Sequence, residues 1–525
     1  MHAECVLDKN MKTFNTTGTC DPKVHYMVNI DRQVDAAATL VRQGHYFCIN
    51  RGRQYGKTTT LAALARKLKS EYCVFKISFE GLGDSAFVSI ETVCAEFLKI
   101  LKRCSRVNGS SPQVVSILKE FVPIGMREVL TSDFADIVEE LCNASDRPLV
   151  VLIDEVDQAG NNDAFIKFLG VLRNMFLSRD EFPTFQSVIL AGVYDVKNLK
   201  LKIRSDEDHQ YNSPWNIAVT FDTDMSLPAD GIAGMLDDYA NEHDIQFDTT
   251  AIGQLIYDYT SGYPFLVSRL CQIIDQNQFG WDKEGVLQAV NALLKERNTL
   301  FDDMFKKLDQ FPELWELFKD ILFSGKRIPY SIDDVSIQIA SMFSFVKEEQ
   351  GALVIFCRLM ETRIYNAMML KLRNDFTDYG ERNKPKFIVD GRLNMRLVLE
   401  KFVMYFNEIY ADSDTKFLEK EARKQFLLYL RPIINGVGNY YVEAETRDQT
   451  RADVVVDYLG QQYVIELKIW HGERYNEEGE QQLRQYLEYF QVAEGYLVSF
   501  CFNKNKQPGI HEVKVGDRTI IEAVV

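Results

Sequence analysis

One stretch of the sequence, NRGRQYGKTTTLAAL (residues 50–64), most constrains how this chain can fold. It follows the apolar run HYFCIN (45–50) and continues into a segment with helical composition. A strand, a glycine-containing turn and a helix in this order place backbone N–H groups and the positive end of a helix dipole at one point. Lys57 then supplies a cation for phosphate oxygens, and Thr58 supplies a hydroxyl for Mg²⁺. The stretch therefore predicts a phosphate-binding loop.

One residue of this loop departs from the usual pattern, because Arg51 stands where the first glycine is expected. That position needs a permissive backbone less than Gly56, which sits beside the phosphate. The alternative interpretation is a basic surface turn before a helix. The residues predicted to contact the nucleotide are Arg51, Gly52, Arg53, Gln54, Tyr55, Gly56, Lys57, Thr58 and Thr59.

A second motif, PLVVLIDEVD (148–157), is an apolar strand that ends in Asp154 and Glu155. Chemistry at a phosphate loop needs one carboxylate for Mg²⁺ and one group to position the attacking water. We therefore expect Thr58 and Asp154 to hold the metal and Glu155 to be catalytic. Two solvated acids at the end of a strand are the alternative.

Short apolar runs recur between these motifs and after them, namely YCVFKISF (72–79), SVILAGV (187–193) and WNIAVTF (215–221). Longer segments with helical spacing separate them, which is typical of buried parallel strands in an α/β fold. The pattern becomes helical from about residue 231. From about 300 to 372 it predicts a compact helical region with a small hairpin.

Residues 12 to about 275 resemble an AAA-like P-loop ATPase of the branch with Arg-Gln before Gly-Lys-Thr, here RQYGKTT (53–59). The resemblance implies ATP and Mg²⁺ as cofactors. It makes His25 and Tyr26 candidates for adenine contacts, with simple packing as the alternative. It makes Arg204 a candidate for sensing the γ-phosphate, with an ordinary solvated arginine as the alternative.

The same resemblance extends to the lid and to the region after it. TSGYPFLVSRLC (260–271) is similar to the Gly-x-Pro element of a helical lid, with Gly262 and Pro264 in its positions. Residues 323–365 are similar to a winged helix, which touches DNA in some proteins and only links domains in others. The linker role is favoured because the charge there is mixed. An arginine supplied to the γ-phosphate also implies closure or a homo-oligomer.

The C-terminal part contains a second group of chemical residues in TRADVVVDYLGQQYVIELKIW (450–470). Asp453 begins one strand, and Glu466 and Lys468 lie on the next. Residues two apart in a strand share a face, so Glu466 and Lys468 should point to the same side. Asp453 and Glu466 can hold Mg²⁺ through hard oxygens, and Lys468 can orient water and stabilise developing charge.

This pattern resembles the PD-(D/E)XK nuclease superfamily over roughly 411–525. Upstream, FLEKEARKQFLLYL (417–430) matches the first helix of that fold, with Glu421 as a further metal ligand and Glu419 as second choice. Downstream, QQLRQYLEYF (481–490) supplies Gln482 and Tyr486 in a Gln-x-x-x-Tyr pattern. The alternative is a degenerate nuclease fold that only binds.

Composition and charge limit the partners and the location. The net charge is −16, so a nucleic acid must meet a local basic groove. The ten cysteines include no CxxC pair, which argues against a zinc knuckle or a redox motif. Because no signal-like segment or membrane-length apolar run is found, we expect a cytoplasmic protein without a membrane partner.

These observations predict four domains: an ATPase core (1–230), a helical lid (231–299), a winged-helix-like connector (300–410) and a nuclease-like α/β domain with a restriction-endonuclease-like fold (411–525). The predicted function is an ATPase whose nucleotide state gates a Mg²⁺-dependent nuclease acting on nucleic acid, with DNA favoured. Defence or processing of mobile DNA would fit such a protein. The alternative is a signal-transducing NTPase switch whose C-terminal domain only binds nucleic acid or a partner protein.

Overall fold

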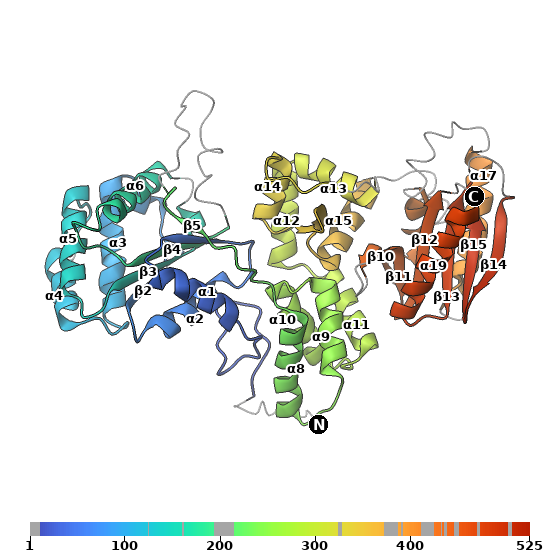
Figure 1. The fold of residues 1–525 in the computed structure, drawn as a ribbon, viewed down its shortest axis with the longest axis horizontal. Helices are drawn as coiled ribbons and strands as arrows, with labels where there is room; N and C mark the ends of the chain where they lie inside the picture. Colours follow the sequence, from blue (N-terminus) through green and yellow to red (C-terminus); the bar gives the residue numbers. More distant parts are fainter. Residues whose placement is uncertain are drawn as a thin grey trace, which may run out of the picture. The chain divides into compact units, whose positions relative to one another are not determined.

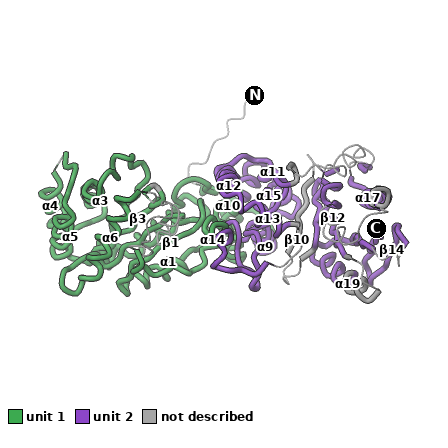
Figure 2. Tube along the Cα trace, turned by 90° about the horizontal axis from the view of Figure 1, so that it is seen from above, with its two compact units in different colours: residues 1–249, 262–269, 339–344 green, residues 250–261, 270–338, 345–525 purple. Residues whose placement is uncertain are grey.

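The computed structural model of the chain describes most of its residues. The described ranges are 11–123, 125–159, 162–193, 215–323, 328–371, 387–389, 392–410, 425–431, 433–434, 438–445, 451–469, 473–501 and 507–525. The chain divides into two compact units, which Figure 2 colours separately. The first unit is Met1–Thr249, Gly262–Arg269 and Ile339–Ser344, and the second is Thr250–Ser261, Leu270–Gln338 and Phe345–Val525.

Five parallel strands form the centre of the first unit (Figure 1). They are β1 (Phe47–Asn50), β2 (Cys73–Ser78), β3 (Leu149–Asp154), β4 (Ser187–Gly192) and β5 (Val219–Thr220). Their order is β2-β3-β4-β1-β5, and each neighbouring pair is parallel. β3 and β4 are buried along their whole length, which explains their nearly continuous apolar sequence. The predicted α/β fold with a parallel sheet is confirmed.

Helices cover both faces of this sheet (Figure 1). On one face, alternate residues such as Val151 and Ile153 of β3 pack with apolar residues from four helices in one core cluster. Those helices are α3 (Ile90–Ser105), α4 (Pro112–Phe121), α5 (Thr131–Ala144) and α6 (Asp163–Leu177). The other face carries α1 (Asp31–Arg42) and α2 (Lys57–Leu68), and short 3-10 turns η1 (Asp84–Phe87) and η2 (Val156–Gln158) join elements.

Side-chain caps set where several of these helices begin. Ser89 accepts a hydrogen bond from the N–H of Thr92 at the start of α3, and Ser111 does the same for Val114 at the start of α4. Pro112 follows Ser111 in the first turn of α4, where its missing N–H costs nothing. Polar residues just before the apolar stripe therefore fix the starts of these two helices in the sequence.

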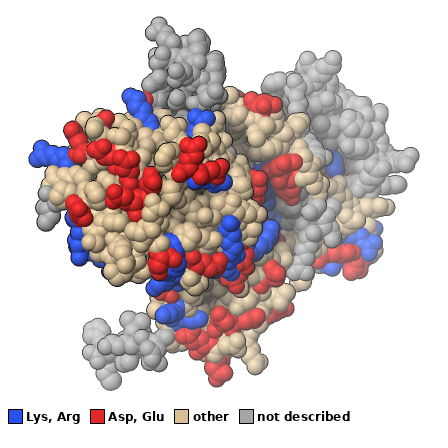
Figure 3. Space-filling model, turned by 60° about the vertical axis from the view of Figure 1, so that its left-hand side comes forward, with Lys and Arg blue, Asp and Glu red and all other residues tan. Residues whose placement is uncertain are grey.

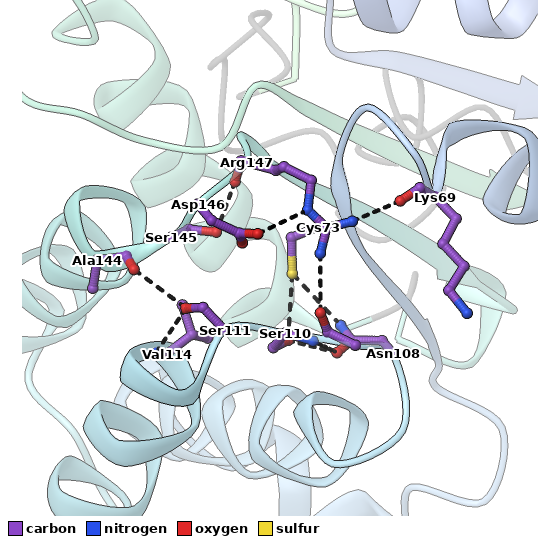
Figure 4. Close-up of polar contacts among 11 residues, drawn as sticks. Lys69, Cys73, Asn108, Ser110, Ser111, Val114, Ala144, Ser145, Asp146 and Arg147 are labelled. Atoms are coloured by element: carbon purple, nitrogen blue, oxygen red, sulfur yellow. Dashed lines mark hydrogen bonds and ion pairs between the residues drawn. The ribbon is translucent and has the colours of Figure 1, made fainter.

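The amino ends of β2 and β3 are tied together by a polar cluster, shown in Figure 4. The Arg147 guanidinium donates to the carbonyl oxygens of Lys69 at 2.7 Å and Gly109 at 3.0 Å. The Asn108 amide donates to the carbonyl of Val74 at 3.0 Å. In such folds, ligands bind at the carboxyl ends of the strands. This cluster lies at the opposite ends, the amino ends of β2 and β3. We therefore assign it a structural role.

A run of helices follows β5, at the position where the sequence predicts the lid. They are α8 (Ala229–His243), α9 (Thr249–Thr260), α10 (Pro264–Gln276) and α11 (Lys283–Lys295). The connector then contributes α12 (Thr299–Gln310), α13 (Glu313–Phe323), α14 (Val335–Met342), the antiparallel hairpin of β6 (Val346–Glu349) and β7 (Ala352–Ile355), and α15 (Arg358–Lys371). The helices and hairpin agree with the pattern predicted for 300–372, and the winged-helix assignment stays a prediction.

The C-terminal part of the second unit is built on a six-stranded mixed sheet. Its strands are β10 (Gly438–Glu445), β11 (Arg451–Tyr458), β12 (Gln461–Ile469), β13 (Glu494–Phe500), β14 (Gly509–Val515) and β15 (Arg518–Val524). The order is β10-β11-β12-β13-β15-β14, with β12, β13 and β15 parallel and the other pairs antiparallel. The described helices of this part are α17 (Met395–Tyr410), residues 425–431 and α19 (Glu473–Tyr489), and β8 (Ile388–Val389) pairs with β9 (Arg392–Leu393).

Two expectations about this part stay predictions. The expected domain boundary at 411 lies outside the described residues, and the restriction-endonuclease-like fold remains a proposal for the mixed sheet. Among the helices that the structure describes, none is long and apolar enough to cross a membrane.

Candidate functional site

The phosphate loop connects β1 to α2 at the carboxyl edge of the parallel sheet. Gly56 directly precedes α2 with a left-handed backbone, φ 82°, and Gln54 is also left-handed, φ 54°. Left-handed residues in a turn help successive N–H groups to face one concavity, and the helix dipole adds positive charge there. The backbone therefore fits the phosphate group of a nucleotide. The sequence identified the loop but did not reveal the unusual conformation of Gln54.

Arg51, at the position of the expected glycine, has a structural role in the loop. Its φ is not positive, so no glycine is required there. Its guanidinium donates to the carbonyl oxygens of Asn50 at 2.8 Å and Thr223 at 2.9 Å, with a longer contact to Phe221 at 3.3 Å. These contacts fix the end of β1 to the chain that follows β5.

Lys57 is 7% exposed and points into the loop. Its Nζ donates to the carbonyl oxygens of Arg51 at 2.9 Å and Gly52 at 2.8 Å. Burial lowers the pKa of Lys57, and three nearby carboxylates oppose this effect, in decreasing order Asp157, Glu155 and Asp154. The lysine thus lies between the loop and a group of negative charges.

Asp154 is the last residue of β3, two strands from β1, and Glu155 follows it. Asp154 is 3% exposed, and its Oδ1 accepts the N–H of Glu155 at 3.0 Å. Glu155 is half-buried with a left-handed backbone, φ 54°. Burial raises the pKa of Glu155, and the positive charge of Lys57 opposes the rise. Both acids act on the pKa of Lys57, which agrees with the two motifs forming one site.

Sequence reasoning missed Asp157, which has the largest carboxylate influence on Lys57. Both of its oxygens accept the N–H of Val193, at 3.0 and 2.7 Å. A Cβ on Gly192 would lie 2.8 Å from Asp157 Oδ1, so the close approach requires glycine there. The signal available in the sequence was the third acid of DEVD together with a glycine at the end of the next strand.

The N-terminal segment contacts α2 and the lid helix α8. The N–H of Cys20 donates to Thr59 Oγ1 at 3.1 Å. His25 Nδ1 accepts the N–H of Asp21 at 2.9 Å. Tyr26 is buried, and the centroid of its ring lies 5.2 Å from the ring centroid of Tyr239. The segment is anchored beside the phosphate-loop helix, and the adenine contacts of His25 and Tyr26 stay predictions.

The Gly-x-Pro element of the lid contacts the phosphate loop inside the first unit. Gly262 has φ 70°, and a Cβ there would lie 2.2 Å from the carbonyl oxygen of Leu227. The hydroxyl of Tyr263 donates to the carbonyl of Arg53, and its ring meets that of Tyr55 edge-on at 4.8 Å. The turn before α10 therefore has a direct hydrogen bond to the loop that is expected to hold phosphate.

Two predicted residues cannot be placed in either site. Arg204 and Glu421 both lie outside the described residues. Their roles stay predictions.

The second predicted site lies on β11, β12 and α19. The N–H of Leu467 donates to Asp453 Oδ2 at 2.7 Å, and the N–H of Asp453 lies 3.4 Å from Glu466 Oε2. Asp453 thus accepts a hydrogen bond from the residue after Glu466, and Glu466 accepts one from the backbone of Asp453. Glu466 is 1% exposed. Burial, and then the charge of Asp453, raises the pKa of Glu466 to about 8, while Lys468 opposes the rise.

Lys468 extends this pair of acids into a chain of polar contacts. Its Nζ lies 2.9 Å from Glu466 Oε1, so the two side chains share a face as the strand spacing predicts. The same Nζ donates to Gln482 Oε1 at 3.2 Å, and the Gln482 amide donates to the Tyr486 hydroxyl. Residues from two strands and a helix thus form one array, and only Glu421 of the predicted set lies outside the described residues.

The chemistry of this array fits a divalent cation. Burial, and then the neighbouring charge of Asp453, raises the pKa of Glu466. A cation bound by both carboxylates would offset both effects. Within the described ranges no group of three or more His, Cys, Asp and Glu side chains is placed to hold a metal ion. A third carboxylate would have to come from elsewhere, and Glu421 is the predicted one.

The first unit defines a class of protein. A strand, a phosphate loop and a helix, with acids at the carboxyl end of β3 in a parallel sheet, are the features of a P-loop NTPase. The chain belongs to the AAA-like domain family, which it matches over residues 20–365. The predicted AAA-like P-loop ATPase is thereby confirmed, and this match does not reach the C-terminal sheet.

Other comparisons add little. No curated protein matches the chain. The Walker-type ATPase of Pyrococcus abyssi is 13% identical, with a TM-score of 0.44, and the alignment covers 67% of this chain and 99% of that one. The ORC1 protein of Aeropyrum pernix in complex with DNA is 11% identical, with a TM-score of 0.31, and 66% and 94% are covered. These partial likenesses carry no functional conclusion.

Proposed function

We propose that this chain is an ATPase of the AAA-like type whose nucleotide state controls Mg²⁺-dependent cleavage of nucleic acid by its C-terminal domain. The observation that carries the proposal is the contact array from Asp453 and Glu466 through Lys468 to Gln482 and Tyr486. It is attached to a chain whose first part belongs to an ATPase family. The proposed domains are 1–230, 231–299, 300–410 and 411–525.

At the ATPase site each residue has a separate task. Lys57 and the N–H groups after Gly56 bind the phosphates, and Thr58 and Asp154 hold Mg²⁺. Glu155 orients the water that attacks the γ-phosphorus. A cation held there would neutralise charge that develops on the phosphate oxygens. Arg204 remains the proposed arginine for the γ-phosphate, brought in by closure or by a second copy of the chain.

At the C-terminal site Asp453 and Glu466, with Glu421, would hold the divalent cation. That cation would polarise the phosphodiester and lower the pKa of a water molecule. Lys468, oriented by Gln482, steadies the negative charge that develops on the phosphate. Water then adds to phosphorus, the phosphorus–oxygen bond to the leaving nucleotide breaks, and the leaving oxygen takes up a proton.

Charge restricts where a nucleic acid can approach. Several patches of acidic side chains lie on the face shown in Figure 3, with Lys and Arg side chains among and below them. Exposed acids on α5, such as Asp133, Asp136 and Glu140, add to the negative charge of the ATPase core. A polyanion is repelled from such a surface. The proposal therefore places the nucleic acid at the C-terminal site near Lys468, and DNA is favoured as the substrate.

Contacts within the second unit suggest how the sites communicate. The hydroxyl of Tyr489, on the same helix as Gln482 and Tyr486, donates to Asp258 of α9 at 2.5 Å. Four residues after Asp258 the chain reaches Gly262, where the turn that contacts the phosphate loop begins. A change in that turn would thus be transmitted over a short stretch of chain to the helix that carries the catalytic array.

The proposal is tested with purified protein, plasmid, linear and single-stranded DNA, and RNA, each with and without Mg²⁺ and ATP. We expect cleavage that needs Mg²⁺ and changes with ATP. Asp453→Asn should abolish it, and Lys468→Ala should slow it about 10²- to 10³-fold, since one electrostatic group is lost. Glu512→Gln, an exposed acid on β14, is the matched control and should cleave normally.

The outcomes separate the two functions. If no substrate is cut above the Asp453→Asn background, the nuclease is wrong. An NTPase switch whose C-terminal domain only binds nucleic acid or a protein then becomes the better account. If Lys57→Ala binds ATP as well as the wild-type chain does, the assignment of the phosphate loop is wrong.

A further inference from the structure

We propose that the hydroxyl of Ser344, in the connector, senses whether Lys57 is engaged by nucleotide phosphates. The inference rests on the proposed binding of nucleotide at Lys57. It adds an intramolecular contact that regulates that site.

Ser344 contacts the phosphate loop directly. The N–H of Gly52 donates to Ser344 Oγ at 3.0 Å, and this hydrogen bond is buried. A Cβ on Gly52 would lie 2.6 Å from the carbonyl oxygen of Phe343 and 3.0 Å from the Ser344 side chain. The loop and the segment Phe343–Ser344 thus fit together closely, and only glycine at position 52 permits that fit.

Lys57 and Ser344 hold opposite ends of one peptide group. The carbonyl of Arg51 and the N–H of Gly52 belong to the same rigid plane. The carbonyl end accepts from Lys57 Nζ at 2.9 Å, while the N–H end donates to Ser344. A rotation of this peptide about the chain therefore changes both contacts together.

Phosphate binding competes with one of these contacts. The lysine ammonium has three N–H donors, and two of them are used by the carbonyls of Arg51 and Gly52. Phosphate oxygens are stronger, charged acceptors. One N–H remains for a first phosphate oxygen, so contact with both the β and γ oxygens requires Lys57 to leave one of the two carbonyls. When it leaves the carbonyl of Arg51, that peptide becomes free to rotate. The hydrogen bond to Ser344 is then weakened.

The position of Ser344 gives this change an effect beyond the loop. Ser344 lies between α14 and β6 with a left-handed backbone, φ 57°. Residues Ile339–Ser344 group with the first unit, whereas the chain from Phe345 onward groups with the second. Release of Ser344 would therefore act at a point where the chain passes from one unit to the other.

The direction of the effect follows from linkage. If the Ser344 contact is stronger without phosphates at Lys57, removing the hydroxyl must favour the phosphate-bound loop. In Ser344→Ala the buried N–H of Gly52 loses the Ser344 hydroxyl as its acceptor. The phosphate-free conformation of the loop, which makes this hydrogen bond, is therefore less stable in the variant. We expect Ser344→Ala to bind ADP and a non-hydrolysable ATP analogue about two- to tenfold more tightly, the range for one hydrogen bond.

Isothermal titration calorimetry measures this effect, with Ser336→Ala in α14, the helix that precedes Ser344, as the matched control. Hydrogen exchange on the wild-type chain supplies a second readout, because nucleotide should speed exchange of the amides at 340–346. An unchanged or weaker affinity of Ser344→Ala would overturn the proposal, and so would slower exchange in this segment. A wild-type chain that binds no nucleotide would instead overturn the proposed function itself.

Discussion

Glu155 combines a left-handed backbone with a half-buried carboxylate. A residue other than glycine in this conformation costs about 1–2 kcal/mol, so the surrounding structure must hold it in place. The hydrogen bond that the Glu155 N–H donates to Asp154 Oδ1 helps to hold this backbone conformation. Strain of this kind concentrates at functional sites. The conformation is therefore consistent with the catalytic role that we propose for Glu155.

Glu155→Gln keeps the shape of the side chain and removes its charge. We expect ATP to bind with unchanged affinity and hydrolysis to slow about 10²- to 10⁴-fold, the usual contribution of a positioned acid or base. Phosphate release and calorimetry measure the two quantities. Glu120→Gln, an exposed acid near the end of α4, is the control for a change of charge. Hydrolysis by Glu155→Gln at the wild-type rate would remove the residue from the mechanism.

Among the elements, the turn between α9 and α10 leaves little room for a side chain. Gly262 has φ 70°, and an added Cβ would meet the backbone of Leu227 at 2.2 Å. We expect Gly262→Ala to lower the free energy of unfolding by more than about 1 kcal/mol, since the backbone is strained and displaced. Gly234→Ala is the matched control, because Gly234 lies in α8 with nothing near its Cβ position.

Chemical denaturation measures both variants. Gly234→Ala should be neutral or stabilising by up to about 1 kcal/mol, the helix preference of alanine. We also expect Gly262→Ala to weaken nucleotide binding, because the next residue, Tyr263, holds the phosphate loop. Equal stability of the two variants would show that the turn adapts and does not report the state of the loop.

Elements with a local signal were predictable from the sequence. The strands of the first sheet are apolar runs with helices between them, and Gly56, Lys57 and Thr58 have a fixed spacing. The features that the sequence did not reveal depend on contacts between distant residues. Ser344 meets Gly52 across 292 positions, and Asp157 gains its place through Val193. Neither contact has a sequence pattern, because it exists only once the strands and helices have packed.

The contacts among the residues of the proposed C-terminal site were predictable for a similar reason. Strand alternation placed Glu466 and Lys468 on one face, and the helix spacing brought Gln482 next to Tyr486. The pairing of β11 with β12, which brings Asp453 to Glu466, follows from a short turn between the strands. The link from Tyr489 to Asp258, 231 positions away, had no such local origin.

At the scale of the whole molecule, the proposed function requires nucleotide state to reach the C-terminal site. The last turn of α19 and the residue after it are held by the lid at two points inside the second unit. Tyr489 donates to Asp258, and Lys283 of α11 donates to the carbonyl of Phe490 at 2.9 Å. Neither Tyr489 nor Asp258 belongs to the array that would cut nucleic acid. Coupling and catalysis can therefore be separated by mutation.

Tyr489→Phe removes one hydroxyl and leaves the ring in place. We expect Mg²⁺-dependent cleavage without ATP to stay at the wild-type level, and the change of rate caused by ATP to shrink about tenfold, since a hydrogen bond to a charged group is lost. Asp258→Asn should have a similar effect, and the double variant should be no worse than either single one, because both changes break the same contact. Gel-based cleavage assays, run beside ATP hydrolysis by the same proteins, measure the two activities. If the double variant shows the sum of two independent effects, or if the response to ATP is unchanged, the signal does not pass through this hydrogen bond.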